Sequence, residues 1–260
     1  MKRRITRYAF LFLMMAALLI FGIAGIAQTD LQKNTTDQQL ITFILDDLED
    51  AGTWLSEMPR DQGVIFSMKR EGAPRKVKAR VAAIKKVNDE YIKRNSRGRR
   101  LKENPLAGFP YNENKYILGV RVEFMKRGYN WFTVKPPLPI KVPGICKSIS
   151  VWVVGRGYSH ELWLMIRDYN GHRRYLQSML KLNHRGWRRM RFPIRDDKIE
   201  QNDYKVTDPK KIGITFDGFL IQCDPLESRG KYYIYFDLIT AEVDLYFEFQ
   251  KDEDDVPDFW

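Results

Sequence analysis

The segment at 150–171, SVWVVGRGYSHELWLMIRDYNG, holds the side chains best suited to acid–base chemistry in this 260-residue chain. His160, Glu161 and Arg167 follow a glycine-rich loop between two apolar runs that each carry a Trp. General acid–base catalysis needs such groups to converge on one cavity. His160 and Glu161 are adjacent in an extended context, so their side chains should point to opposite faces of a strand. The chain also lacks G-x-S-x-G and HExxH spacing, so we predict no catalytic residue and no enzyme.

Carboxylates offer a second kind of chemistry, because calcium prefers carboxylate and carbonyl oxygens as ligands. Asp46 and Asp47 end an early apolar run, and Asp237 lies in the last one. The first and last strands of exported β-sandwiches are often neighbours, which makes Asp47 and Asp237, with Asp46, candidate calcium ligands. The preferred interpretation is that they are solvated acids at turns, and neither a metal nor another cofactor is predicted.

Two cysteines, Cys146 and Cys223, are separated by 77 positions. In an oxidising compartment they could form a disulfide. They could equally be two small buried residues, because free cysteine packs as a hydrophobic side chain. Both alternatives stay open, and no cysteine spacing of the zinc-binding type is present.

Positive charge is concentrated at 69–100, which has 13 basic and 3 acidic residues, a net charge of +10. After Pro74, the residues Val81, Ile84, Asn88 and Tyr91 recur near helical spacing and predict a basic amphipathic helix of about 18 residues. Six of its cations are candidates for binding an acidic partner: Arg75, Lys76, Lys78, Arg80, Lys85 and Lys86. The alternative is an ordinary solvated face.

The segment GWRRMRFPI at 186–194 is unusual because neither of its faces is apolar throughout. Trp187, Arg189 and Arg191 share one face of an extended strand. Arginines on an edge strand discourage pairing with other chains, which is one interpretation. The other is a partner-binding face, since Arg and Trp are enriched at protein interfaces.

Exposed aromatic rings can stack on sugars, so the tryptophans are relevant to glycan binding. Trp152 and Trp163 lie within apolar runs, where core packing is expected. Trp54, Trp131 and Trp187 have less certain surroundings in the sequence. The composition is therefore compatible with a glycan-binding module without indicating a site.

Period-two alternation dominates the chain from residue 116 onward. In VRVEF at 120–124 the apolar residues fall on one face and the charged residues on the other. Further strands are predicted at 40–45, 130–135, 148–154, 162–167, 187–194, 212–222 and 232–249, each bounded by turn residues. Many short strands with little helix predict a mainly β protein, an antiparallel β-sandwich with an inserted basic helix near the N-terminus.

Residues 1–27 have the layout of a secretory signal peptide, with basic residues, an apolar stretch at 8–26 and small residues before the expected cleavage site. The apolar stretch is also long enough for an uncleaved anchor. We expect a strand and loop at 28–68, a basic helical and loop insertion at 69–110, the sandwich at 111–250 and an acidic tail at 251–260. An exported protein of this kind should bind no nucleic acid and, after cleavage, should not insert stably into a membrane.

Five segments resemble the flagellar filament outer layer (FlaA, sheath) proteins of spirochaetes. They are PPLPI at 136–140, KSISVWV at 147–153, RDYNG at 167–171, LNHRGW at 182–187 and IQCDP at 221–225. The similarity covers roughly residues 116–243, and LDDLED at 45–50 is similar to the end of the family's N-terminal strand. The basic segment and the acidic tail depart from the family pattern.

The resemblance implies a jelly-roll fold like that of carbohydrate-binding modules and a location on the periplasmic flagellum. It also implies a structural role in the filament sheath, with an influence on filament shape, stiffness and motility. The implied partners are the flagellin core filament, other sheath proteins and glycans carried by flagellin. A periplasmic glycan-binding module is the alternative function. We further expect that the basic segment at 75–86 and the acidic run at 252–255 could meet head to tail between subunits.

Overall fold

The computed structural model of the chain describes residues 40–96, 114–195, 199–201 and 213–244. The predicted signal peptide at 1–27 and the acidic tail at 251–260 lie outside these residues. The chain divides into two compact units, 1–40 and 41–260, and the second contains the sheets described below. Within the described ranges, no helix has the length and apolar character needed to cross a membrane.

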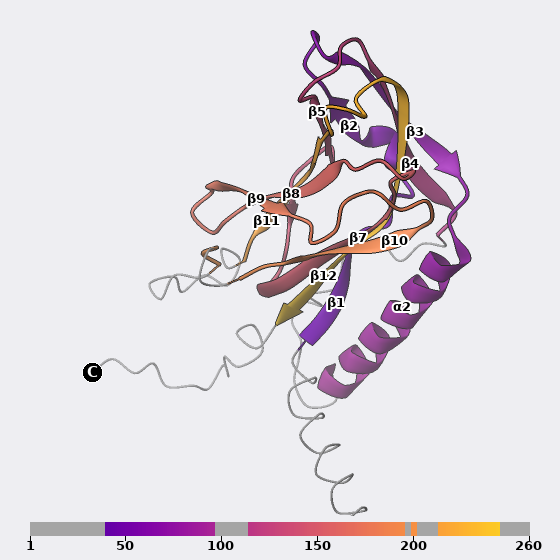
Figure 1. The fold of residues 1–260 in the computed structure, drawn as a ribbon. Coiled ribbons are helices and arrows are strands. Elements are labelled where there is room, and N and C mark those ends of the chain that lie inside the picture. Colours follow the sequence, from indigo (N-terminus) through magenta and orange to yellow (C-terminus); the bar gives the residue numbers. More distant parts are fainter. Residues whose placement is uncertain (1–39, 97–113, 196–198, 202–212, 245–260) are drawn as a thin grey trace, which may run out of the picture. The chain divides into compact units, whose positions relative to one another are not determined.

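Two mainly antiparallel sheets pack face to face, as the alternating pattern predicted (Figure 1). In sheet A the strands follow the order β10-β7-β12-β4-β3, and β1 pairs with β12. Its strands are β1 (Leu40–Asp46), β3 (Gly63–Glu71), β4 (Tyr116–Phe124), β7 (Ile145–Val154), β10 (Arg188–Pro193) and β12 (Gly230–Asp244). In sheet B the order is β2-β5-β11-β8-β9, and β6 pairs with β11. Its strands are β2 (Leu55–Glu57), β5 (Trp131–Lys135), β6 (Ile140–Lys141), β8 (Glu161–Arg167), β9 (Arg173–Gln177) and β11 (Thr215–Gln222).

The main core fills the space between the two sheets. In β4, Val120 and Val122 are buried while Arg121 faces outward, as the alternation predicted. Phe219 of sheet B and Phe236 of sheet A stack across the core with ring centroids 5.5 Å apart. Complete burial of each ring contributes about 1.5–3 kcal/mol.

A second, smaller core lies on the outer face of sheet A, beneath helix α2 (Arg75–Ser96). The helix begins directly after Pro74, as predicted, and its 22 residues exceed the expected length. Its buried stripe of Val77, Val81 and Ile84 packs on Ile44 of β1 and Leu238 of β12. In Figure 1, α2 accordingly runs beside β1 and β12. A β-bulge between Asp237 and Ile239, with Leu238 at a φ of 44°, turns Leu238 outward toward the helix.

Strand β3 was not predicted, and the expected boundary between the N-terminal segment and the insertion, at residue 69, falls inside it. Its sequence GVIFSMKRE obscures the alternation because Val64, Phe66 and Met68 are apolar but exposed. Strands β2, β6 and β9 were also missed: the first two are three and two residues long, and β9 is mostly polar and exposed.

The glycine-rich loop between β7 and β8 serves close packing. A Cβ at Gly155 would lie 2.1 Å from the carbonyl oxygen of Leu182, which only glycine avoids. Gly157 follows with a φ of 83°, in the left-handed region. These glycines therefore shape a turn that lets the chain pass against Leu182.

Candidate partner-binding surfaces

His160 is a core residue. Its side chain is fully buried, and its Nδ1 accepts a hydrogen bond from the backbone N–H of Asp224 at 3.0 Å. The ring packs edge-on against Tyr232, with centroids 4.6 Å apart. Burial lowers the pKa of His160 to about 4, although Glu227 and Asp224 raise it in part. Such a ring is neutral near pH 7.

Glu161 points the other way, as predicted from its position next to His160. Its Oε2 accepts a hydrogen bond from Gln177 Nε2 at 2.9 Å, and its Oε1 lies 3.2 Å from Lys181 Nζ. Arg167 is also engaged on the outer face of sheet B, where its Nε lies 2.7 Å from Asp217 Oδ2. These groups do not converge on one cavity with His160.

The three acids considered as calcium ligands are held by the protein itself. Asp46 accepts a hydrogen bond from Trp54 Nε1 at 3.1 Å, and Asp237 accepts one from Asn114 Nδ2 at 3.2 Å. Burial raises the pKa of Asp46 to about 6 and that of Asp237 to about 7. Asp47 and Asp237 are only 4% and 0% exposed, so their interpretation as solvated turn acids is wrong. Among the described residues, no group of three or more His, Cys, Asp or Glu side chains is arranged to hold a metal ion.

Cys146 and Cys223 are both buried, and no disulfide joins them in this structure. The backbone of Cys146 is bonded at 2.8 Å by the side chain of Gln201, whose carbonyl accepts from Gly213 N–H at 2.7 Å. Cys146 therefore lies near the start of β11, and Cys223 directly follows its end. The eight residues of β11 span about 25 Å. A disulfide allows a Cα separation of only about 4.4–6.8 Å.

The tryptophans are distributed differently from expectation. Trp54, a candidate for sugar stacking, is 3% exposed and belongs to the main core. Trp152 and Trp163 are half-buried and face outward, and Trp152 packs beneath α2. Trp131 is 43% exposed, beside β2 on sheet B. The expected core packing of Trp152 and Trp163 in the sandwich is therefore wrong.

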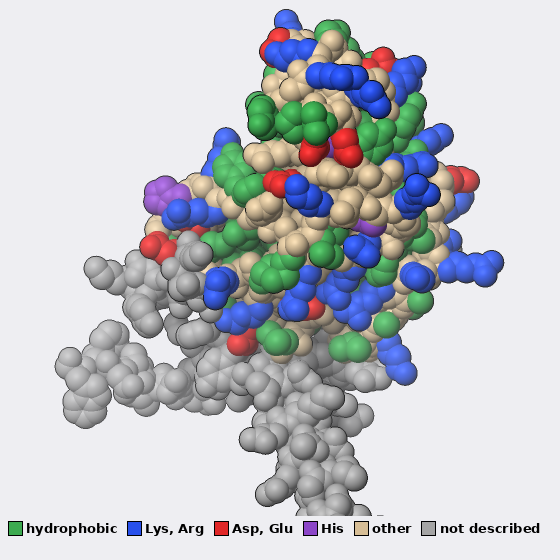
Figure 2. Space-filling model, in the orientation of Figure 1, with side chains coloured by type: hydrophobic (Ala, Val, Ile, Leu, Met, Phe, Trp, Pro, Cys, Tyr) green, Lys and Arg blue, Asp and Glu red, His purple; other side chains and the backbone are tan. Residues whose placement is uncertain are grey.

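The predicted cations of α2 lie on the surface. Arg75, Lys76, Lys78, Lys85 and Lys86 are exposed, and Arg80 is half-buried. They surround the apolar stripe that attaches the helix to sheet A, so the helix is held rigidly while its charges meet solvent. Figure 2 shows that, on the face of the molecule seen in Figure 1, Lys and Arg side chains are spread widely over the described surface.

Trp187, Arg189 and Arg191 lie at or next to β10, an edge strand of sheet A. Glu242 of β12 accepts from Arg189 Nη2 at 3.0 Å and from Arg191 Nη2 at 2.6 Å. Burial alone would raise the pKa of Glu242, but a hydrogen bond from Ser148 and the two guanidinium groups outweigh it and hold the pKa below its usual value. Both arginines are thus partnered within the subunit, and their role in binding another protein stays a prediction.

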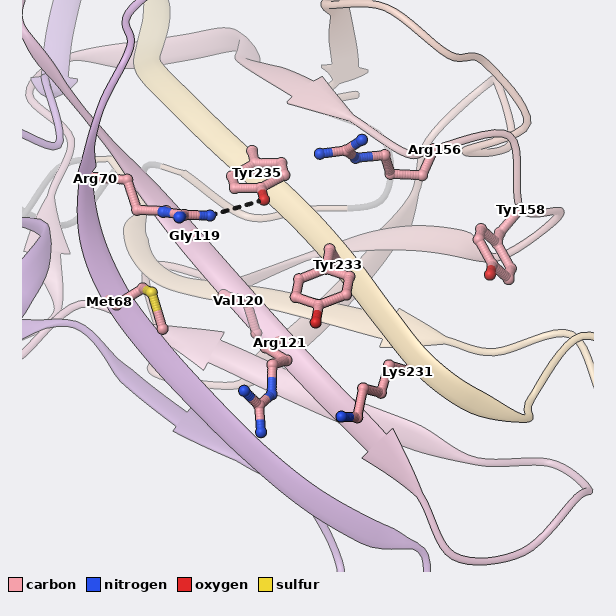
Figure 3. Close-up of a pocket in the computed structure, with 10 residues that line it drawn as sticks. All are labelled: Met68, Arg70, Gly119, Val120, Arg121, Arg156, Tyr158, Lys231, Tyr233 and Tyr235. Atoms are coloured by element: carbon pink, nitrogen blue, oxygen red, sulfur yellow. Dashed lines mark hydrogen bonds between the residues drawn. The ribbon is translucent and has the colours of Figure 1, made fainter.

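A groove on the outer face of sheet A was not predicted from the sequence. It has a volume of about 600 Å³ and crosses strands β3, β4 and β12 (Figure 3). We call it the Arg–Tyr groove, lined by Met68, Arg70, Gly119, Val120, Arg121, Arg156, Tyr158, Lys231, Tyr233 and Tyr235.

Strand register builds the groove. Tyr233 pairs with Arg121 and Tyr235 with Gly119, so outward positions of β12 and β4 lie side by side. A Cβ at Gly119 would lie 3.2 Å from the ring of Tyr235 and 3.2 Å from Arg70 Cδ, so this glycine leaves room for both. Arg70 Nη1 donates to Tyr235 Oη at 3.3 Å, and the guanidinium of Arg156 lies 5.2 Å from the centre of the Tyr235 ring.

One carboxylate adjoins these cations. Glu123 Oε1 lies 2.5 Å from Arg121 Nη2 and 3.5 Å from Lys231 Nζ. Arg121 also lies over the ring of Phe66, 5.2 Å from its centre, and its Nε has no hydrogen-bond partner among the described residues. The groove therefore has cationic donors in excess.

Comparison with known proteins matches the chain to one family model. The model describes the flagellar filament outer layer protein FlaA, and the match covers residues 26–251. A flagellar filament outer layer-like protein of Brachyspira hyodysenteriae is 36% identical over 228 residues, covering 88% of this chain and 90% of that protein.

Two of the solved structures that match this chain are carbohydrate-binding modules. One, from the β-sandwich superfamily, has a TM-score of 0.42 at 10% identity, and the match covers 75% of this chain and 60% of that one. Another is the family 11 module of Clostridium thermocellum in complex with a mixed-linked tetrasaccharide. Its TM-score is 0.36 at 11% identity, with 77% of this chain and 94% of that one covered.

Proposed function

Because the chain belongs to the flagellar filament outer layer (FlaA) family, we propose that it is a structural subunit of the sheath of a periplasmic flagellar filament. In this role it coats the flagellin core, together with other sheath proteins, and performs no catalysis. It influences the shape and stiffness of the filament and so the motility of the cell.

The observation that carries the proposal, beside family membership, is the cationic surface of α2. The helix is anchored on sheet A by Val77, Val81 and Ile84, which keeps its exposed lysines and arginines at fixed positions. A rigid array of like charges suits an acidic, repeating partner surface, because charge complementarity speeds encounter and sets the register of binding. A filament of identical subunits is such a partner.

An uneven coat would act mechanically. Subunits placed on one side of a flexible core stiffen or shorten that side, and the filament then curves. The sandwich is a suitable unit for this, since its core is closely packed and resists compression. The expected periplasmic location agrees with the signal peptide indicated by residues 1–27.

A periplasmic glycan-binding module is the second candidate. The aromatic rings of the Arg–Tyr groove favour it, because Tyr233 is 36% exposed and its ring could stack on a sugar. Glycans on flagellin would make this compatible with the first candidate.

Co-sedimentation of the exported protein with purified core filaments, over a series of salt concentrations, tests the proposal. We expect saturable pelleting that weakens with salt, because the contacts on α2 are exposed to solvent. Lys78→Glu with Lys85→Glu should weaken pelleting. The matched control, Arg127→Glu with Arg173→Glu, changes the same charge at exposed positions away from α2 and should not. Absence of pelleting by the folded wild type at every salt concentration would contradict the sheath function, and saturable binding of free oligosaccharides instead would favour the glycan module.

A further inference from the structure

The chemistry of the Arg–Tyr groove selects the kind of ligand it can take. Its lining includes Arg70, Arg121, Arg156 and Lys231, and no Asp, Glu, Asn or Gln side chain. A neutral sugar presents hydroxyl groups that donate as well as accept, and the only side-chain oxygen acceptors in this lining are the hydroxyl groups of its three tyrosines. A lining of cationic donors and tyrosine rings instead suits a ligand that combines carboxylates with aromatic groups. Arginine is suited to this because it can bind a carboxylate through two parallel hydrogen bonds.

The protein's own sequence contains a segment of this chemistry. Residues 251–260, KDEDDVPDFW, hold five acidic side chains, one Lys and, at 259 and 260, a Phe and a Trp. We propose that the Arg–Tyr groove binds the acidic segment 251–260 of a second copy of the chain. The proposal rests on the sheath function, because it supplies the contact that joins one subunit to the next.

The Arg–Tyr groove and the segment 251–260 are complementary in charge and in apolar surface. Four cations line the groove, and Glu123 beside it offsets one of them. The five acids and one Lys of the segment leave a net charge of −4. Next to the cations, Phe66 and Met68 of β3 are 46% and 41% exposed and offer a surface for Phe259 and Trp260. Aromatic anchors of this type supply much of the affinity at protein interfaces.

The geometry of β12 favours a second copy over the same chain. Tyr235 lies in the groove, and the strand continues for nine more residues to Asp244, about 30 Å further along sheet A. Asp252 follows eight residues later and can lie at most about 27 Å from Asp244. Helix α2 packs on Leu238, between the groove and Asp244, so the acidic run of the same chain would have to return across the helix. A neighbouring copy meets no such obstacle.

A contact between a tail and a groove joins two different surfaces. Such a heterologous contact repeats without limit unless its rotation closes a ring, so it builds chains of subunits. An outer layer that covers a long filament needs that property. The earlier expectation that the acidic run meets α2 assigns a different receptor to the same segment, and the two receptors can be separated by mutation.

Three matched variants of the full exported protein test the proposal. The groove variant carries Arg70→Glu and Arg156→Glu, and the tail variant carries Asp252→Asn and Asp254→Asn, which removes charge from the tail without making it complementary to the reversed groove. The helix variant, Lys78→Glu with Lys85→Glu, has the same charge change as the groove variant at another cationic surface. Sedimentation velocity at low ionic strength, over a hundredfold range of protein concentration, measures self-association. Circular dichroism checks that each variant is folded, and Tyr233→Ala serves as a second groove variant without charge change.

We expect the wild type and the helix variant to form progressively longer oligomers with increasing concentration. The groove and tail variants should each associate at least roughly tenfold more weakly, because close charge pairs across interfaces are strongly coupled. Mixing these two variants should restore association but stop it at dimers, since the intact tail of one fits the intact groove of the other and both remaining surfaces are blocked.

Three results would overturn the proposal: a wild type that stays monomeric throughout, a helix variant weakened as much as the groove variant, or a groove variant that associates like the wild type. Binding of oligosaccharides lost only in the groove variant, with self-association unchanged, would identify a glycan site and also overturn it. Pelleting with core filaments is measured in parallel. If the tail variant still pellets with core filaments, the sheath function is supported even when the tail contact is absent. If neither the wild type nor any variant pellets, the sheath function itself is contradicted.

Discussion

Replacement of His160 by Asn should make the free energy of unfolding less dependent on pH in the acid range. In the folded protein burial lowers the pKa of His160 from 6.5 to about 4. Between these values the unfolded chain binds more protons than the folded one, so the free energy of unfolding rises with pH over this window and falls as the pH is lowered through it. A difference of this size corresponds to about 3 kcal/mol, since each pKa unit is worth about 1.4 kcal/mol. The side chain is 0% exposed, so solvent screening does not reduce this figure greatly.

Urea unfolding at pH 7.0 and pH 4.5 measures the effect. Asn places an oxygen near the position of Nδ1, so the hydrogen bond from Asp224 N–H is preserved without a titrating group. The loss of unfolding free energy on acidification should be smaller in His160→Asn than in the wild type by about 2–3 kcal/mol. His172→Asn removes an imidazole whose side chain is 69% exposed and is the matched control. An equal loss in the wild type and His160→Asn would refute the description of His160 as a neutral core residue.

Three further perturbations follow from the buried groups. In the wild type, the unfolding free energy should fall as the pH rises from about 4 to about 7, because burial raises the pKa of Asp237 to about 7 and the folded state keeps the proton over this range while the unfolded state loses it. Asp237→Asn should remove this fall. Urea unfolding at pH 5 and pH 8 should show the wild type losing about 2–3 kcal/mol more than the variant, and a parallel loss in both would contradict this. Cys146 and Cys223 should resist a thiol reagent in the native protein and react as two thiols after unfolding without reductant, whereas no reaction after unfolding would mean that they are oxidised. Ile84→Ala, at a side chain 3% exposed beneath α2, should lower the unfolding free energy by about 2–4 kcal/mol. Val87→Ala on the same helix, at a side chain 60% exposed, should leave it within about 0.5 kcal/mol, and equal effects of the two changes would argue against the packing of α2 on sheet A.

The spacing of apolar residues along the sequence predicted those strands and that helix in which buried and exposed side chains follow a regular period. VRVEF in β4 has its valines in the core, and the stripe of Val81, Ile84 and Asn88 attaches α2 to the sheet. Asn88 can belong to that stripe because its Nδ2 donates to the carbonyl of Thr42 at 3.0 Å, which gives this polar group a partner at a buried position.

Residues whose environment depends on the register of distant strands could not be predicted in the same way. Trp152 lies in an apolar run, between Val151 and Val153, which face the core; it therefore points outward, where it packs against the cluster beneath α2. The two cysteines are not joined by a disulfide because they lie near opposite ends of β11, which spacing in the sequence does not reveal. The Arg–Tyr groove joins β3 and β4 to β12, which lies more than a hundred positions after either of them in the chain. A weak local signal existed in KYYIYF at 231–236, where outward tyrosines alternate with buried residues.

The division of one sheet face into two parts would allow a single sandwich to bind the two partners that we propose. Without α2, Ile44 and Leu238 would be exposed apolar groups on the outer face of sheet A. The helix covers them and replaces an apolar surface by a cationic one, while the Arg–Tyr groove at the other end of β12 stays open. The two cationic surfaces are fixed to the same strand, so they hold a constant distance and direction. A subunit that contacts the core filament through one and its neighbour through the other therefore transmits the spacing of the core to the coat, which is the condition for a coat to bias curvature.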